Sequence, residues 1–302
     1  MSTTTSALTS FEEALEKVRS LAVIRQQNLE SLSTITDSSS VLCDGNFRSL
    51  PRCVPDQGWG LSEASDFLFK TVEPLLNPGH SGPRYFGFVT GGTLPSALIA
   101  DWFTSLYDQN VQVHLPKETC STVIEAFTME MIIDLLGLNS KRFSGTLTTG
   151  ATGSNLLALI CAREETTKRC MYRRSGIADW SAAEYGLSGS DSVTIQVFVC
   201  QAHASIRKTA ALAGIGRANV IDVGKTAPTS TNRQQPDVVC LEFDLKRLER
   251  ELKRRYEAKE PSIVVVGMGE VVTGALSDQT PKLRQLCNKY EAWLHVDAGE
   301  QG

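Results

Sequence analysis

The sequence predicts an α/β protein whose mostly parallel β-sheet is covered by helices on both faces. Short apolar runs of strand length alternate along the chain with longer segments whose apolar residues recur at helical spacing. Some of the runs, such as residues 263–266, are continuously apolar, which is typical of parallel strands buried on both faces. A chain of 302 residues is long enough to bury a core of this kind.

The N-terminal part of the chain is predicted to be a separate helical segment. A capping box at Ser10 and Glu13 predicts the start of a first helix. Residues 31–60 are rich in Ser, Pro and Gly and predict an irregular connection, and a second helix is expected over residues 61–76. The predicted division is therefore a helical segment over 1–80 and a large domain over 81–302.

The large domain is predicted to alternate strands and helices. The predicted strands cover residues 145–148, 193–199, 219–223, 263–266 and 292–296. The predicted helices cover residues 124–135, a stretch from about 156, 206–213, 245–256 and 280–290. Ligands of such sheets bind beyond the carboxyl ends of the strands, so the residues that follow the strands are the candidates for chemistry.

Composition and charge argue against several classes of function. The formal net charge of −4 offers no basic excess for nucleic acid. No stretch approaches 18 consecutive apolar residues, so no membrane-spanning helix is expected, and the polar N-terminus does not resemble a secretory signal. The eight cysteines include no C-x-x-C pair, which argues against a disulfide framework and a zinc site. We expect a cytoplasmic protein with reduced thiols and no metal.

A Gly-rich segment, residues 148–155, lies between a predicted strand and a predicted helix. Its small residues and the helix N-terminus suit an anion such as phosphate, and the hydroxyls of Thr149, Thr152 and Ser154 add donors. The alternative is a plain Gly-rich turn, because the segment is neither a Walker loop nor G-x-G-x-x-G. Glycines elsewhere in the chain also lack a full dinucleotide fingerprint, which argues against NAD.

Two titratable side chains follow predicted strands. His203 can stack its imidazole on an aromatic ring, whereas a lone histidine in this position is otherwise a structural hydrogen-bonding residue. Asp297 can pair with a protonated ring nitrogen or with a metal, and the alternative is a helix-cap or turn aspartate. His295 beside Asp297 could form a metal pair, but the sequence offers no third ligand.

Taken together and in order, these segments resemble the group II pyridoxal-phosphate-dependent decarboxylases. This family of fold type I includes the aromatic amino acid, histidine and glutamate decarboxylases. The matching segments are residues 82–95 with 108–110 (substrate side), 148–155 (phosphate loop), 201–216 (histidine motif), 269–275 (a G-x-V-N-T-G-A-like segment) and 295–298 (H-V-D-A-A). The resemblance runs from about residue 60 to the end, and its strength lies in five modest motifs in the right order.

The resemblance implies pyridoxal 5'-phosphate as the cofactor and a role for each matching residue. Ala151 and Thr152 would bind the phosphate group. His203 would stack on the pyridine ring, and Asp297 would pair with the pyridine nitrogen and keep it protonated. The resemblance also implies a homodimer.

The resemblance further implies the substrate side and the sheet order. Tyr85 and Phe86 would lie near an amino-acid substrate. The strands would lie in the order 219–223, 193–199, 263–266, 292–296, then two further strands, then 145–148. Since the sequence shows no candidate for those two strands, we expect either a gap in the sheet or a pairing of 145–148 with 292–296. We also expect an exposed apolar strand edge and poor solubility.

The chain departs from the family pattern in several places. Ala151 and Gly153 stand where Gly and Glu are usual, and Glu270 and Val271 replace the common paired threonines. The family's lysine that binds the cofactor covalently lies in an H-K motif, and no such motif is present here. We therefore expect an incomplete, C-terminally truncated fold type I domain that is inactive by itself.

Three functions are consistent with these observations. The first is decarboxylation of an amino acid by a carboxy-lyase. The second is other fold type I chemistry, such as amino transfer or carbon–sulfur cleavage, which would give a different product. The third is a non-catalytic truncated paralogue that binds or dimerises. The sequence does not identify the amino acid.

Overall fold

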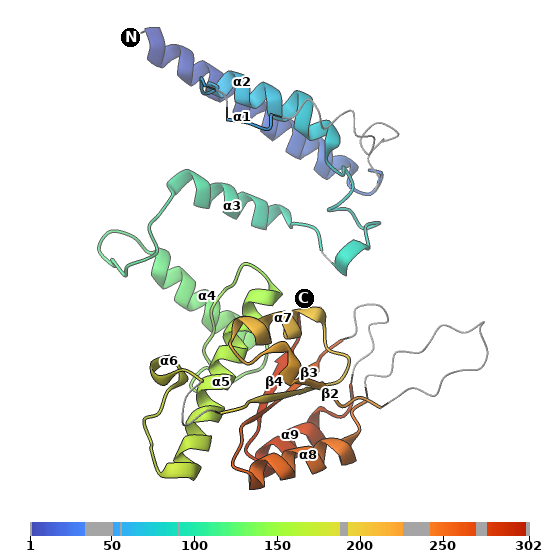
Figure 1. Ribbon diagram of the computed structural model, residues 1–302. Coiled ribbons are helices and arrows are strands. Elements are labelled where there is room, and N and C mark those ends of the chain that lie inside the picture. Colours follow the sequence, from blue (N-terminus) through green and yellow to red (C-terminus); the bar gives the residue numbers. More distant parts are fainter. Residues whose placement is uncertain are drawn as a thin grey trace, which may run out of the picture. The chain divides into compact units, whose positions relative to one another are not determined.

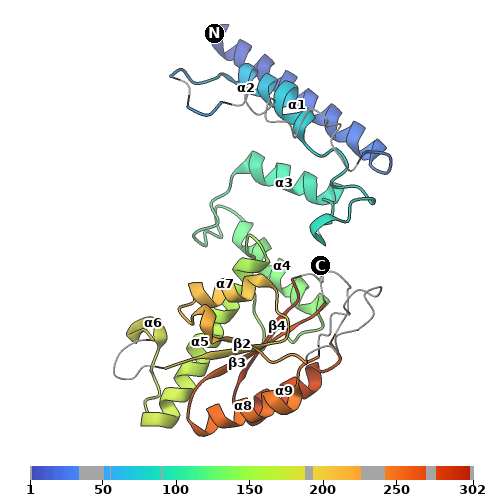
Figure 2. The ribbon, with the colours of Figure 1, turned by 45° about the vertical axis from the view of Figure 1, so that its right-hand side comes forward.

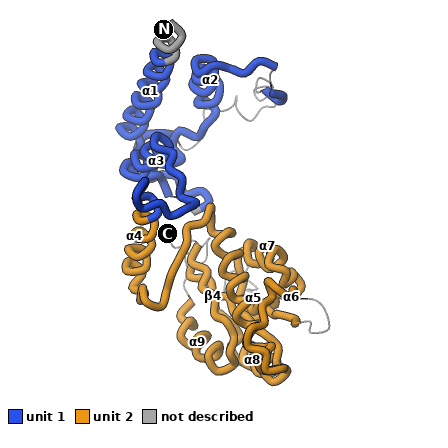
Figure 3. Tube along the Cα trace, turned by 90° about the vertical axis from the view of Figure 1, so that its left-hand side faces the viewer, with its two compact units in different colours: residues 1–122 blue, residues 123–302 orange. Residues whose placement is uncertain are grey.

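The computed structural model describes residues 2–33, 51–54, 56–89, 91–187, 193–225, 242–269 and 277–299. By mutual contact the chain divides into two compact units, unit 1 over residues 1–122 and unit 2 over residues 123–302 (Figure 3). The boundary predicted near residue 80 separates a helical segment from a cofactor-binding domain. That functional division stays a prediction.

The described residues of unit 1 are mainly helical. The helices are α1 (Ser2–Asn28), α2 (Leu61–Phe67), a π turn (Leu68–Val72), two 3-10 turns (Glu73–Leu75 and Gly87–Val89) and α3 (Pro95–Tyr107). The chain is helical from 61 to 75, close to the predicted 61–76. The capping box predicted at Ser10 is wrong, because α1 already begins at Ser2 and runs through it. Helix α3 was not predicted; it starts with Pro95 at its first position and ends at Asp108, which has a left-handed backbone.

Unit 2 is built on a four-stranded parallel sheet. Its strands are β1 (Gln196–Val199), β2 (Val220–Asp222), β3 (Ser262–Gly267) and β4 (Trp293–Asp297). They lie side by side in the order β2-β1-β3-β4. Figure 2 shows this sheet with α8 and α9 below it. The register places Val197 beside Val220 and Ile263, and Val265 beside His295. The sheet order predicted for these four strands is confirmed.

The strand predicted at residues 145–148 is wrong. In the structure this segment has no regular secondary structure, and it makes no ladder with β4. An extended segment becomes a β-strand only when its N–H and C=O groups pair with a neighbouring strand. Within the described residues no strand of the sheet lies beside this segment, so its local sequence is not enough to make it a strand.

Helices cover both faces of this sheet. The helices of unit 2 are α4 (Ser121–Leu135), α5 (Ala151–Ser175), α6 (Ala182–Tyr185), α7 (Ala204–Leu212), the 3-10 turn Arg217–Asn219, α8 (Leu245–Glu257) and α9 (Thr280–Lys289). Figure 1 shows α5 and α7 on one face and α8 and α9 on the other. Alternate strand residues serve the two faces: Val197 and Val265 pack with α5 and α7, whereas Phe198 and Val264 pack with α8 and α9.

The two buried layers stabilise the sheet and thereby hold its carboxyl ends in place. Phe198, Leu248 and Leu283 are each at most 1% exposed. Burying a side chain of this size contributes about 1.5–3 kcal/mol. The segments that follow β1, β3 and β4 are therefore carried by a rigid platform.

Candidate cofactor-binding site

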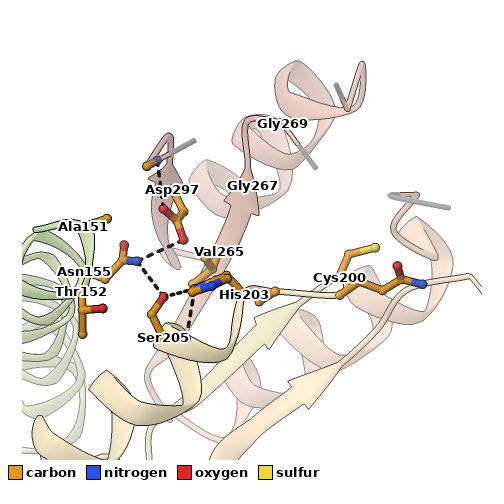
Figure 4. A pocket seen from close by; sticks show the side chains of 13 residues that line it. Ala151, Thr152, Asn155, Cys200, His203, Ser205, Val265, Gly267, Gly269 and Asp297 are labelled. Atoms are coloured by element: carbon orange, nitrogen blue, oxygen red, sulfur yellow. Dashed lines mark hydrogen bonds between the residues drawn. The ribbon is translucent and has the colours of Figure 1, made fainter. Parts of the chain in front are cut away.

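Six residues have a role implied by the family resemblance, and four of them line one pocket of unit 2 (Figure 4): Ala151, Thr152, His203 and Asp297. The pocket lies at the carboxyl ends of the parallel strands and at the N-termini of α5 and α7, where open α/β sheets bind ligands. The other lining residues are Asn155, Cys200, Gln201, Ala202, Ser205, Val265, Gly267, Gly269 and Gly299. Its volume of about 120 Å³ is small beside the roughly 300–1,000 Å³ of a complete ligand pocket.

The first turn of α5 forms the anion-binding side of the pocket. The first backbone N–H groups of a helix have no acceptor within the helix, and in α5 no side chain at Gly150 caps them. Those N–H groups and the dipole of a 25-residue helix favour a phosphate. The Thr148 hydroxyl hydrogen-bonds the Ser154 hydroxyl at 2.7 Å and donates to the Gly150 carbonyl at 3.1 Å, which fixes the loop before the helix.

A close approach of Gly299 to the Ala151 side chain shapes the same side. A Cβ added to Gly299 would lie 2.9 Å from the Cβ of Ala151. Real Cβ atoms essentially never come so close, so the glycine allows the chain after β4 to pass beside the start of α5. The space in front of the helix N-terminus therefore depends on Gly299.

His203 combines the two interpretations that the sequence left open. It is the N-cap residue of α7, and its Nδ1 accepts a hydrogen bond from the Ser205 backbone N–H at 3.2 Å. The same nitrogen lies 2.8 Å from the Ser205 hydroxyl. Because Nδ1 accepts from the backbone, the proton of the neutral ring is on Nε2. His203 is thus a structural cap whose exposed ring also lines the pocket.

Asp297 ends β4 with its carboxylate held from two sides. Its Oδ2 accepts from the Asn155 side-chain amide at 3.1 Å, and its Oδ1 accepts from the Gly299 backbone N–H at 3.3 Å. Its backbone carbonyl accepts from the Met268 N–H at 2.8 Å, which ties β4 to the end of β3. The half-buried carboxylate is therefore a fixed negative group on the pocket wall.

Asn155 lines the pocket although the sequence assigned it no role, and His295, which the sequence offered only for a metal pair, is its hydrogen-bond partner. Asn155 is 3% exposed and also donates to the Ser205 hydroxyl at 3.2 Å. His295 directs Nε2 to the Asn155 Oδ1 at 2.8 Å. Burial lowers the pKa of His295, and the nearby Asp297 carboxylate raises it by a smaller amount. The signal available in the sequence was that Asn155 ends the phosphate-loop motif.

The metal pair considered for His295 and Asp297 finds no support in the contacts. The His295 Nε2 is engaged by Asn155, and no group of three or more His, Cys, Asp or Glu side chains that could hold a metal occurs in the described part of the chain.

None of the helices among the described residues combines the length and apolar character that a membrane span requires.

Tyr85 and Phe86 belong to unit 1, whereas the pocket belongs to unit 2. The Tyr85 ring packs on His80 with 4.3 Å between ring centroids, and Phe86 is 86% exposed. Their substrate-side role stays a prediction. Glu270 and Val271, two departures from the family motif, lie outside the described residues. Among the described residues that line the pocket, none is a lysine.

A helix N-terminus, an imidazole and a carboxylate at the strand ends form the kind of site that suits a phosphorylated aromatic cofactor. Comparison with known proteins agrees with this class. Residues 61–302 match the model of the pyridoxal-dependent decarboxylase conserved domain. The chain therefore belongs to the pyridoxal-dependent decarboxylase family, whose cofactor is pyridoxal phosphate.

Two curated relatives carry names from the same family. L-2,4-diaminobutyrate decarboxylase of Acinetobacter baumannii is 30% identical over 281 residues, which are 91% of this chain and 52% of that protein. Glutamate decarboxylase of Drosophila melanogaster is 25% identical over 256 residues, which are 84% of this chain and 44% of that protein. The chain thus spans about half the length of the curated relatives it matches.

Solved structures show the same fold. The crystal structure of Oryza sativa TDC with PLP and tryptamine gives a TM-score of 0.71 at 19% identity, over 96% of this chain and 57% of that one. The glutamate decarboxylase domain of diaminobutyrate-pyruvate transaminase and L-2,4-diaminobutyrate decarboxylase from Vibrio parahaemolyticus gives a TM-score of 0.70 at 19% identity, over 94% of this chain and 58% of that one. The predicted fold type I class is confirmed, and the sheet of the described residues contains four of its strands.

Proposed function

We propose that this chain supplies the pyridoxal-phosphate-binding part of an amino acid decarboxylase. The observation that carries the proposal is that one pocket brings together the uncapped N-terminus of α5, His203 and Asp297. These groups come from residues up to 146 positions apart in the chain, from Ala151 to Asp297, and they match the phosphate, the ring and the ring nitrogen of the cofactor.

Each residue has a task that follows from its chemistry. Bound pyridoxal phosphate supplies an electron sink for the electron pair left when carbon dioxide departs. The Ala151 and Thr152 backbone N–H groups, with the Thr152 hydroxyl, would donate to the phosphate. The Asp297 carboxylate would accept from the ring N–H and hold that proton at the nitrogen, and the His203 imidazole would pack against the ring. The half-buried position of Asp297 strengthens such a charge pair relative to open water.

Decarboxylation is favoured over the other chemistries that the sequence left open. Amino transfer and carbon–sulfur cleavage would use the same cofactor-binding residues, so the pocket alone does not separate them. The two curated relatives are both named as amino acid decarboxylases, which supports a carboxy-lyase acting on an amino acid. Tyr85 and Phe86 remain our candidates for its substrate side.

The proposal includes a cytoplasmic homodimer. Three cysteines, Cys53, Cys120 and Cys161, are exposed free thiols, which suits a reducing compartment. Helix α4 presents large apolar side chains at Phe127 and Met131 that are 59% and 63% exposed. Exposed apolar side chains in such a row are typical of a protein interface, and a second copy of the chain is the partner we propose.

Cofactor binding tests the proposal directly. The probe is 4-deoxypyridoxine 5'-phosphate, which carries the phosphate and ring nitrogen but lacks the aldehyde that reacts with lysines. We expect one saturable site on the full chain, followed by fluorescence, and competition by inorganic phosphate. Asp297→Ala should weaken the affinity about tenfold or more, because a charge-assisted hydrogen bond contributes about 1.5–3 kcal/mol.

The control variant is Asp278→Ala, which removes an exposed carboxylate from the turn before α9 and should leave the affinity unchanged. Equal loss of affinity in the two variants, or a wild-type chain that shows no saturable binding, would contradict the proposed function.

A further inference from the structure

Asn155 is the most connected polar side chain in the pocket. It projects from the first turns of α5, and its amide group hydrogen-bonds partners on two other elements, Ser205 on α7 and Asp297 and His295 on β4. At 3% exposure it is buried, so water does not replace these partners. Figure 4 shows its amide group between the Asp297 carboxylate and Ser205.

The chemistry of the partners determines how the amide is turned. An ionised carboxylate can only accept hydrogen bonds, so the NH₂ group of Asn155 must face Asp297. The Oδ1 atom then faces the His295 Nε2 at 2.8 Å and can only accept from it. It follows that neutral His295 carries its proton on Nε2. A chain of donors runs from His295 through Asn155 to Asp297.

We propose that Asn155 is a positioning residue, which holds the Asp297 carboxylate in the orientation that meets the cofactor's ring nitrogen, and that His295 locks the Asn155 amide for this task. The inference rests on the proposed function for what Asp297 pairs with, although the hydrogen-bond chain belongs to the protein without cofactor. The alternative is that Asn155 merely joins α5 to β4 as a structural contact.

The second hydrogen bond to the Asp297 carboxylate, from Gly299, is the longer of the two, which supports this role. The Gly299 N–H reaches Oδ1 at 3.3 Å, a longer hydrogen bond than the one from Asn155 at 3.1 Å. Without Asn155 the Asp297 carboxylate would keep the longer hydrogen bond from the Gly299 N–H, and its side chain would regain rotational freedom. The Asn155 amide, itself held by the buried His295, is therefore the contact that fixes the Asp297 carboxylate in one orientation.

The first test reads the chain of donors in the protein without cofactor. In ¹⁵N-histidine-labelled full chain, with the His295 signals assigned by His295→Gln, the ring should show the Nε2–H tautomer. Asn155→Asp places a carboxylate beside Nε2, so we expect the His295 midpoint to rise by about one pH unit or more. Thr166→Val, which removes a buried hydroxyl from the same helix away from the pocket, should leave that midpoint unchanged.

A wild-type Nδ1–H tautomer, or an unchanged His295 midpoint in folded Asn155→Asp, would overturn the inference. The tautomer measurement needs no variant, so it stays decisive if the substitution prevents folding. Both readings are also independent of cofactor. Failure of the proposed function would appear as absence of probe binding by the wild-type chain, whatever the histidine signals show.

The second test separates positioning from structural support. Asn155→Leu should weaken binding of 4-deoxypyridoxine 5'-phosphate about tenfold. Inorganic phosphate should bind as in the wild-type chain, because it would contact the N-terminus of α5 and not Asp297. An equal loss of affinity for both probes would mean that Asn155 supports the pocket as a whole, and the positioning role would be rejected.

Discussion

At the scale of single residues, the pocket uses side chains that also hold the local backbone. His203 caps α7, and Asp297 accepts from the backbone N–H two residues further on. A substitution at either position therefore changes stability as well as ligand binding. Probes such as inorganic phosphate, which meets one part of the pocket, are needed to separate the two effects.

The buried His295 predicts a pH dependence of stability. Burial lowers its pKa below the ordinary value near 6.5, and the nearby Asp297 carboxylate raises it less. As pH falls through about 6.5, the unfolded state takes up a proton before the folded state does, so acid destabilises the fold until the lower folded pKa is reached. We expect the free energy of unfolding in urea to fall between pH 7.5 and 5.5.

His295→Gln should reduce this fall, whereas His114→Gln, which changes an exposed histidine, should not. An identical pH profile in wild type and His295→Gln would rule out His295 as the source.

At the scale of elements, helix α8 is joined to the sheet by a buried arginine. Arg255 is 2% exposed, and its guanidinium donates to the backbone carbonyls of Thr194 and Pro261 and pairs with Glu260 at 2.7 Å. These acceptors flank the starts of β1 and β3. Arg255 therefore connects the helix to the end of the sheet that lies opposite the pocket.

Removing this connection should be costly. Arg255→Leu removes the side-chain donor to the Thr194 and Pro261 carbonyls and leaves Glu260 without its charge partner, and it is expected to lower the free energy of unfolding by about 3 kcal/mol. The matched change on the same helix, Arg254→Leu, removes an exposed pair with Glu251 and should change it by about 0.5 kcal/mol or less. Urea denaturation of both variants measures the difference, and similar midpoints would contradict the assigned role of Arg255.

At the scale of the whole molecule, β4 is the edge strand of the described sheet. A groove of about 930 Å³ runs beside it in unit 2. The apolar residues that line it are Leu136, Leu138, Phe143, Met268, Cys287, Ala292, Trp293, Leu294, Val296 and Ala298. An apolar strand edge of this kind is a template for pairing with other chains, so we expect the isolated chain to self-associate.

A charge on this edge should oppose self-association. Val296 is 44% exposed on β4, and Val296→Lys should raise the concentration at which light scattering detects aggregates, because charged side chains protect sheet edges. Val54→Lys, a change at a 93% exposed valine of unit 1, adds the same charge elsewhere. If the two lysines have equal effects, net charge and not the β4 edge controls solubility.

The sequence by itself determined the class of fold, and through its family resemblance it determined the order of four strands and four of the residues that line the pocket. Continuous apolar runs such as 263–266 become buried strands wherever they lie in the chain, and residues that follow parallel strands meet at one edge of the sheet. His203 and Asp297 could therefore be selected from local pattern and motif order.

Tertiary structure decided the rest, because hydrogen-bond partners are distant in sequence. Residues 145–148 have a strand-like composition but no neighbour in the described sheet, so they are not a strand. In the sequence Asn155 is the last residue of a loop motif. Its orientation is fixed by hydrogen bonds to His295 and Asp297, which are 140 and 142 residues away. The periodicity of apolar residues is a local property of the sequence. The hydrogen-bond partners that fix a side chain's orientation are brought close only by tertiary packing.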